Sequence, residues 1–130
     1  MPNRSPRPVL RRPVVLVLAT LVAVGALTAC SGESVDVTDE TVILDVRTPE
    51  EFVEGHLAGA QNIDVSADDF DERVTQLDTD AQVVVYCRSG IRSADAVERM
   101  EGLGFTDLTD AGGLQQASDA TGLAIVAGQP

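Results

Sequence analysis

One cysteine, Cys87, stands where a nucleophile would be expected. It follows the run QVVVY of residues 82–86 and precedes the segment RSGIR of residues 88–92. Three consecutive valines favour a buried strand, because β-branched side chains are stiff at χ1. The strand would place Cys87 at its carboxyl end, where open α/β sheets bind ligands. A short loop leading into a helix near Ser93 can turn successive backbone N–H groups inward, which makes an anion-binding nest.

Two arginines, Arg88 and Arg92, bracket the Cys87 sulfur. The thiolate is the reactive form of cysteine, and both helix N-termini and neighbouring arginines lower the thiol pKa. Their local effect can outweigh the chain's formal net charge of −12, because exposed charges are screened over about 10 Å. The alternative is a buried, inert cysteine beside two solvated arginines. The strand before the loop and the helix after it favour the reactive thiol.

Apart from its first 29 residues, the chain is strongly acidic. All 21 acidic residues lie after Cys30, and the chain has no lysine. This composition argues against nucleic acid as a partner and against a basic patch on anionic lipid, since both need clustered cations. The ordinary reading of such acidity is solubility. The sequence carries no metal-ligand cluster, nucleotide loop or cofactor signature, so we expect no metal and no cofactor.

The first 29 residues contain four arginines and no acid, and residues 13–29 are uncharged. A basic start, an apolar stretch and small residues at its end are typical of a secretory signal peptide. The stretch ends in LTAC, residues 27–30, which resembles the lipobox of bacterial lipoproteins. That resemblance implies cleavage before Cys30 and acylation of Cys30. The prediction is a signal peptide over residues 1–29, followed by a lipid anchor and tether over residues 30–40.

An uncleaved membrane anchor is the alternative, since residues 13–29 approach the roughly 20 residues of a membrane span. Both interpretations put the acidic domain on the outer face of the cell membrane, because arginines stay inside. The arginine pair before the stretch could also indicate twin-arginine export, but its surroundings fit that signal poorly. With Cys30 acylated, Cys87 is a lone thiol in an oxidising compartment and not half of a disulfide.

Apolar runs and amphipathic stretches alternate after the tether. This alternation predicts an α/β fold with a central, mainly parallel sheet and helices on both faces, preceded by an apolar leader helix that is cleaved. Strands are expected over residues 41–45, 60–63, 82–86 and 105–109, and residues 123–126 are left open. Helices are expected over residues 49–55, 93–102 and 112–122, with a further helix starting after residue 66.

Capping signals mark two of these helices. Thr48, Pro49 and Glu51 form a capping box with proline at the first helical position. Ser66 is expected to cap the helix that follows it, with Asp68 and the next aspartate in its first turn. The apolar spacing of Phe70, Val74 and Leu77 gives that helix one buried face.

Four stretches together resemble the rhodanese (thiosulfate sulfurtransferase) family. Residues 83–93 (VVVYCRSGIRS) are similar to the family's active-site loop. Residues 43–52 (ILDVRTPEEF) resemble its first strand–turn–helix, residues 55–63 (GHLAGAQNI) the loop and strand that follow, and residues 112–113 its late double glycine. The matches run in order, which argues against chance. The usual first helix and the aromatic after the double glycine are missing here.

The resemblance implies a rhodanese-like domain over residues 41–130 that accepts sulfane sulfur as a persulfide and passes it to a thiol or cyanide. Cys87 would form the persulfide, and Asp45 and Arg47 would be a buried charge pair below the loop. His56 is expected to be structural rather than a general base. The resemblance also implies that the outer sulfur is cradled by backbone N–H groups, those of Arg88, Ser89, Gly90, Ile91 and Arg92. The Arg88 and Arg92 side chains would attract an anionic donor such as thiosulfate.

Two other functions stay open. Cysteine phosphatases and arsenate reductases of related fold have a loop one residue longer, to fit a tetrahedral oxyanion, so the five-residue spacing from Cys87 to Arg92 favours sulfur transfer. A non-catalytic module that carries a persulfide or senses thiol redox state would use the same residues. The expected partners are a small anionic sulfur donor, a thiol acceptor and, through lipid, the membrane, and the expected state is a monomer.

Overall fold

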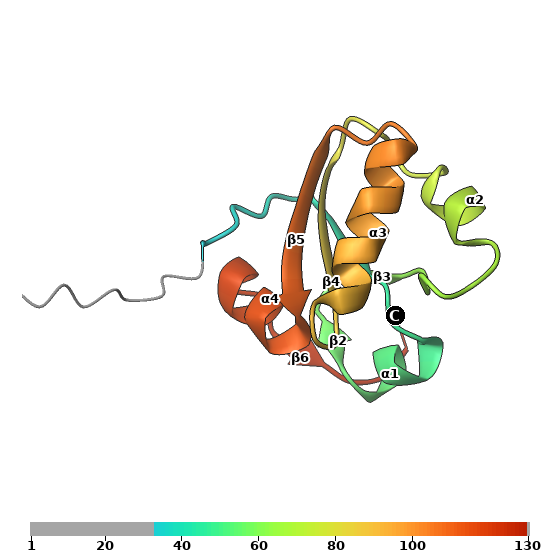
Figure 1. Cartoon of the computed structure of the whole chain (residues 1–130). Helices are drawn as coiled ribbons and strands as arrows, with labels where there is room; N and C mark the ends of the chain where they lie inside the picture. Colours follow the sequence, from blue (N-terminus) through green and yellow to red (C-terminus); the bar gives the residue numbers. More distant parts are fainter. Residues whose placement is uncertain (1–32, 130) are drawn as a thin grey trace, which may run out of the picture.

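The computed structural model describes residues 33–129, which form two sheets and four helices (Figure 1). The predicted signal peptide and Cys30 lie outside the described residues. No helix within this range is long and apolar enough to span a membrane. The strands are β1 Val42–Asp45, β2 His56–Leu57, β3 Gln61–Asn62, β4 Gln82–Cys87, β5 Asp107–Gly113 and β6 Ile125–Val126. The helices are α1 Pro49–Glu54, α2 Phe70–Val74, α3 Ile91–Gly102 and α4 Leu114–Thr121.

The main sheet has four parallel strands in the order β3-β1-β4-β5. Strand β4 lies between β1 and β5, with Val42 opposite Val83 and Asp45 opposite Tyr86 on the β1 side. Because all four strands run the same way, their carboxyl ends meet at one edge of the sheet. The predicted α/β fold with a central parallel sheet is confirmed.

Helices cover both faces of this sheet, and the side chains of β4 alternate between them. Val83, Val85 and Cys87 belong to the core shared with α2 and α3, whereas Val84 and Tyr86 belong to the core shared with α1 and α4. All five side chains are fully buried. A central parallel strand must be apolar on both faces, which explains the uninterrupted apolar run in the sequence.

The second helix begins later than predicted. Helix α2 starts at Phe70 with Asp69 as its N-cap residue, so Ser66 does not cap it and Asp68 lies before it. The reason is a competing turn: the Ser66 N–H donates to Asp64 Oδ1 at 2.8 Å, which holds the chain in a non-helical conformation. Phe70 and Val74 of the predicted face are fully buried, whereas Leu77 lies after the end of α2 and is only partly buried against the same core.

Two further boundaries differ from the predictions near the end of the chain. Strand β5 extends to Gly113, because after a register shift it pairs again with β4, with Gly113 opposite Cys87. The double glycine therefore ends a strand, and α4 begins only at Leu114. The open segment after it forms β6, which pairs with β2 in an antiparallel two-stranded sheet, Leu57 opposite Ile125.

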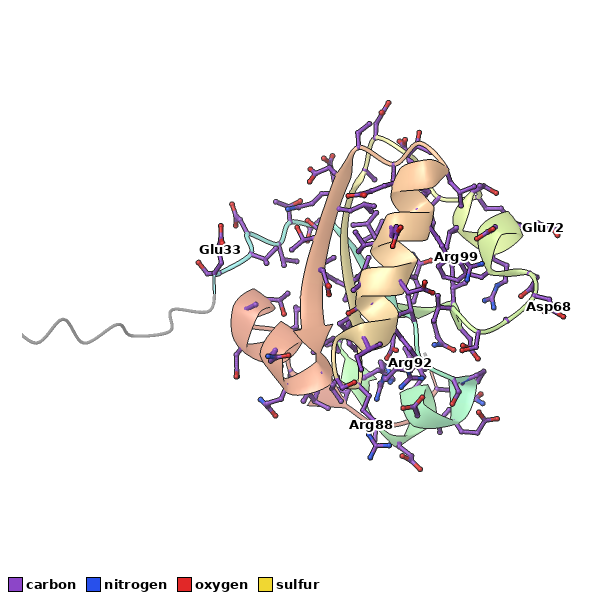
Figure 2. All side chains as sticks on the ribbon, in the orientation of Figure 1. Glu33, Asp68, Glu72, Arg88, Arg92 and Arg99 are labelled. Carbon is purple, nitrogen blue, oxygen red and sulfur yellow. The ribbon has the colours of Figure 1, made fainter. Side chains whose placement is uncertain are left out.

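Residues 33–39, which the sequence analysis assigned to a tether, run against the α1 and α4 face of the domain. Val35 and Val37 pack against the core on that face, and the Val35 N–H donates to Ala120 O at 2.9 Å. Glu33, the first described residue, lies on the outside of the molecule at the α4 side (Figure 2). The described part of this segment is thus attached to the domain.

Candidate active site around Cys87

Cys87 is the last residue of β4, at the edge where the parallel strands end. Only Arg88, Ser89 and Gly90 separate it from α3, which begins at Ile91 and not at the predicted Ser93. Gly90 adopts φ 97°, a left-handed conformation that glycine enters without steric cost, and this allows the sharp turn from strand to helix. The N-terminus of a 12-residue helix therefore lies next to the sulfur.

The loop directs backbone hydrogen at the sulfur. The Gly90 N–H donates to Cys87 Sγ at 2.9 Å, and Ser93 Oγ lies 3.6 Å from Sγ. Cys87 is 0% exposed, so the sulfur lies beneath the loop and not on the open surface. The Gly90 amide thus points at the sulfur, as one member of the predicted nest would, while the sulfur is more enclosed than the sequence indicated.

These contacts affect the acidity of the thiol. Burial alone raises the pKa of Cys87, because it penalises the charged form. The Ser93 hydroxyl and the backbone amides of Ser93, Ser89 and Gly90 act in the opposite direction and prevail, so the Cys87 pKa lies below its ordinary value. The loop thus favours the thiolate, which is the nucleophilic form.

Ser93 was missed by the sequence analysis as a site residue. Its side chain is fully buried, and its Oγ lies 3.1 Å from Gly90 O as well as 3.6 Å from the sulfur. A hydroxyl has one hydrogen, so it can donate either to Gly90 O or to a thiolate. The available signal was a serine in the first turn of the helix that follows the nucleophile.

The two arginines have different surroundings, although both lie at the same end of α3 (Figure 2). The Arg88 side chain is exposed, and no hydrogen bond or ion pair engages it among residues 33–129. The Arg92 guanidinium forms two hydrogen bonds to the Glu51 carboxylate of α1, at 2.7 and 2.8 Å. Ile91, between the loop and Arg92, is 79% exposed.

Asp45 and Arg47 form a buried ion pair at the end of β1. Arg47 Nη2 lies 2.6 Å from Asp45 Oδ2, and Arg47 Nε also donates to this carboxylate. The same Nη2 donates to Gly55 O at 2.6 Å, which ties the pair to the end of α1. Both side chains are at least 95% buried, so the pair supports the elements around the site and does not face a substrate.

His56 is also structural in its surroundings. Its ring stacks on Phe52 with centroids 3.7 Å apart, and its Nδ1 lies 2.8 Å from Phe52 O. It is 4% exposed and held by these contacts with α1, which supports the structural role expected for it. Within residues 33–129, no three His, Cys, Asp or Glu side chains converge as metal ligands.

A broad groove of about 1060 Å³ lies elsewhere, between residues 33–36, β5 and α4, and Cys87 does not line it. Its walls include four carboxylates and no arginine, so it would repel an anionic sulfur donor. It also contains no nucleophilic thiol. The candidate for chemistry is therefore the loop at Cys87. The four carboxylates are those of Glu33, Asp36, Asp110 and Asp119.

The site combines a parallel sheet, a cysteine of lowered pKa at the carboxyl end of its central strand and a short loop with an amide directed at the sulfur, and this combination defines a class of protein. A family model for the Rhodanese-like domain matches residues 33–118, and the chain belongs to this family. Relatives with assigned activities include the thiosulfate sulfurtransferase PspE of Escherichia coli, which is 36% identical over 74 residues. That match covers 55% of this chain and 69% of PspE.

Other relatives agree with this assignment. The thiosulfate sulfurtransferase GlpE of Pseudomonas putida is 37% identical over 68 residues, 52% of this chain and 59% of GlpE. Among solved structures, a rhodanese with anions from E. coli is similar with a TM-score of 0.56 and 31% identity. It is covered over 99% of its length, against 68% of this chain.

Proposed function

We propose that this protein is a sulfurtransferase that carries sulfane sulfur as a persulfide on Cys87. The observation that carries the proposal is the 2.9 Å hydrogen bond from the Gly90 amide to Cys87 Sγ, in a loop that lowers the thiol pKa. A persulfide sulfur is an anion at neutral pH, so the same inward-facing amides would stabilise it. The names of the related PspE and GlpE proteins support thiosulfate as the donor.

The reaction has two balanced steps. In the first, the Cys87 thiolate attacks the outer sulfur of thiosulfate, a new S–S bond forms, and the S–S bond of thiosulfate breaks. Sulfite leaves with the electron pair. In the second, an acceptor thiolate or cyanide attacks the outer sulfur of the persulfide, which gives an acceptor persulfide or thiocyanate and regenerates the Cys87 thiolate.

Arg88 is the cation best placed to attract an anionic donor. It is exposed, lies next to Cys87 and is not held by a carboxylate among the described residues. The backbone of Ser89, Gly90 and Ile91 would then receive the transferred sulfur, with Arg92 at the edge of the loop. The presence of anions in the similar E. coli rhodanese structure is in keeping with this role.

Complete burial of Cys87 has a consequence for turnover. With 0% of the residue exposed, the groups that cover the sulfur must shift before a donor reaches it. If that opening is slow, the protein would hold a persulfide for long periods and act as a carrier. Burial is the observation that favours the carrier as the second candidate function.

Steady-state assays separate these possibilities. The purified domain is incubated with thiosulfate and either cyanide or a dithiol, and thiocyanate or sulfide is followed with time. Turnover over many cycles supports the enzyme, whereas persulfide formation without turnover supports the carrier. Cys87→Ser is expected to abolish both. Hydrolysis of a generic aryl phosphate would instead favour a phosphatase.

The proposal includes attachment to the outer face of the membrane through a lipid on Cys30. The support is the sequence of residues 27–30 and the basic, apolar leader before it. Expression of the full chain in a bacterium fed with an alkyne fatty acid tests it. Labelling of the natural chain and its loss in Cys30→Ala are expected, and equal labelling of both would exclude this anchor.

A further inference from the structure

An ion pair joins the first turn of α3 to α1 beside the active-site loop, where the sequence analysis expected an unpaired arginine. Arg92 Nη1 lies 2.7 Å from Glu51 Oε2, and Arg92 Nη2 lies 2.8 Å from Glu51 Oε1. Two parallel hydrogen bonds of this kind fix both the position and the plane of the guanidinium. The Arg92 side chain is 31% exposed and that of Glu51 20%, so solvent screens the pair only in part.

The Glu51 carboxylate is itself held by the first turn of α1. Glu51 Oε2 accepts the Thr48 N–H at 3.2 Å, and Thr48 Oγ1 accepts the Glu51 N–H at 3.3 Å, which completes the capping box. The Glu51 carboxylate is thus held in place on α1 by the capping box. The guanidinium is therefore drawn toward α1, and its charge is balanced there.

We define the loop mouth as the exposed residues Arg88, Ser89 and Ile91 around Cys87. Arg88 is the cation of this surface that no carboxylate within residues 33–129 pairs with. Arg92 is close enough to the sulfur for a Cys87 thiolate to raise the Arg92 pKa, after the larger effect of the hydrogen bonds that Arg92 donates to Glu51. Release of Arg92 from Glu51 would consequently add positive potential near Cys87.

We propose that Glu51 is a positioning residue that holds Arg92 against α1 and thereby sets how strongly the loop mouth favours anionic sulfur donors. The preference for sulfur donors rests on the proposed function. The effect of Glu51 on the electrostatic potential around Cys87 does not depend on it. Glu51 touches neither donor nor sulfur and acts through Arg92. Its removal should increase the attraction of anions, which is the opposite of what loss of a substrate-binding residue would do.

The test compares two alkylating reagents of similar size on the folded protein, neutral iodoacetamide and anionic iodoacetate. The ratio of their second-order rates with Cys87 reports the local potential and needs no sulfur transfer. Glu51→Gln keeps the side-chain length and the capping box but removes the charge. It is expected to raise the iodoacetate-to-iodoacetamide ratio about three- to tenfold at low ionic strength, with the increase shrinking in high salt.

Two variants control this experiment. Asp71→Asn also removes one carboxylate from an arginine of α3, since Asp71 pairs with Arg99 at 2.7 Å, but that pair lies toward α2. Its ratio is expected to match that of the natural chain. In the double variant Glu51→Gln/Arg92→Gln the increase should disappear, because the freed cation is gone.

Each result has a distinct meaning. An unchanged ratio in Glu51→Gln, or an increase that persists in the double variant, would overturn the proposal. So would a complete lack of Cys87 alkylation in the folded protein, since no donor mouth would then exist. A changed ratio in a protein that forms no persulfide with thiosulfate would uphold the role of Glu51 while the sulfurtransferase function failed. The reverse combination would uphold the function and overturn this role.

Discussion

Gly113 lies directly against the carbonyl of Arg88. A Cβ atom at Gly113 would come within 2.6 Å of Arg88 O, a separation that real Cβ contacts do not show. The end of β5 thus supports the loop after Cys87 from the side, and Gly113 is opposite Cys87 in the sheet register. The need for glycine here comes from lack of space, since its φ of −82° suits any residue. This contact explains why the second residue of the double glycine, Gly113, is a glycine.

Gly113→Ala is expected to push the Arg88 carbonyl away and displace the amides that face the sulfur. Sulfur transfer should fall at least about tenfold, as expected when catalytic geometry shifts by an ångström. The measurement is kcat/KM with thiosulfate. Gly102→Ala is the matched control, because no atom lies within 4 Å of a Cβ there and alanine favours the helix. Equal activity in both variants would show that the loop tolerates the added methyl group.

Ser93→Ala is expected to raise the Cys87 pKa, because it removes a hydroxyl that helps to lower it. The expected increase is up to about one pH unit, since one unit corresponds to about 1.4 kcal/mol and a hydrogen bond to a charged group is worth about that much. The pH profile of Cys87 alkylation by iodoacetamide measures it. In Ser89→Ala the backbone amide remains and the exposed side chain is lost, so the midpoint should stay. Identical midpoints in all three proteins would refute a role for Ser93.

Asp45→Asn is expected to destabilise the fold strongly. It leaves the Arg47 guanidinium buried without its counter-charge, and breaking a buried pair from one side costs about 3–5 kcal/mol of unfolding free energy. Urea denaturation followed by circular dichroism measures this loss. For comparison, Asp71→Asn breaks a more exposed pair and should cost less than about 1 kcal/mol. A similar small loss in both variants would mean that the buried pair adds little to stability.

Glu51 predicts a pH dependence of stability. Its hydrogen bonds with Arg92, the largest cause, lower the Glu51 pKa from 4.5 to about 2. A folded-state pKa below the unfolded value means that the carboxylate stabilises the fold above about pH 4.5, and that this contribution is lost as the pH falls toward 2. The free energy of unfolding of the natural chain should exceed that of Glu51→Gln by about 1 kcal/mol at pH 7, allowing for partial exposure of the pair. Near pH 2 the two free energies should be almost equal. A difference that stays constant with pH would contradict the ion pair.

The elements that position the site were largely readable from the sequence. The valine run before Cys87 predicted β4, because only a strand buried on both faces accommodates it. The capping box of Thr48 and Glu51 predicted the start of α1, because the signal is local and complete. The prediction that Ser66 caps a helix was wrong, because its backbone N–H donates to Asp64 instead. A turn with Asp64 and a helix start at Ser66 are both local structures, so the sequence alone did not decide between them.

Within the site, the sequence predicted only the contacts between residues that are close together in the chain. The loop from Cys87 to α3 meets that condition, and its inward amides follow from its length. The partner of Arg92 does not, because Glu51 is 41 residues away and its recognised capping role gave no sign of a second contact. Full burial of Cys87 was expected only for an inert cysteine, yet the structure combines full burial with a lowered thiol pKa. That combination depends on how β5 and α3 pack around the loop.

The most direct test of the account is the intact mass of the folded domain after incubation with thiosulfate and removal of excess reagent. The natural chain should gain the mass of one sulfur atom, and a dithiol should remove it. Cys87→Ser should gain nothing under the same conditions. A natural chain of unchanged mass, or an equal gain in Cys87→Ser, would contradict a persulfide on Cys87.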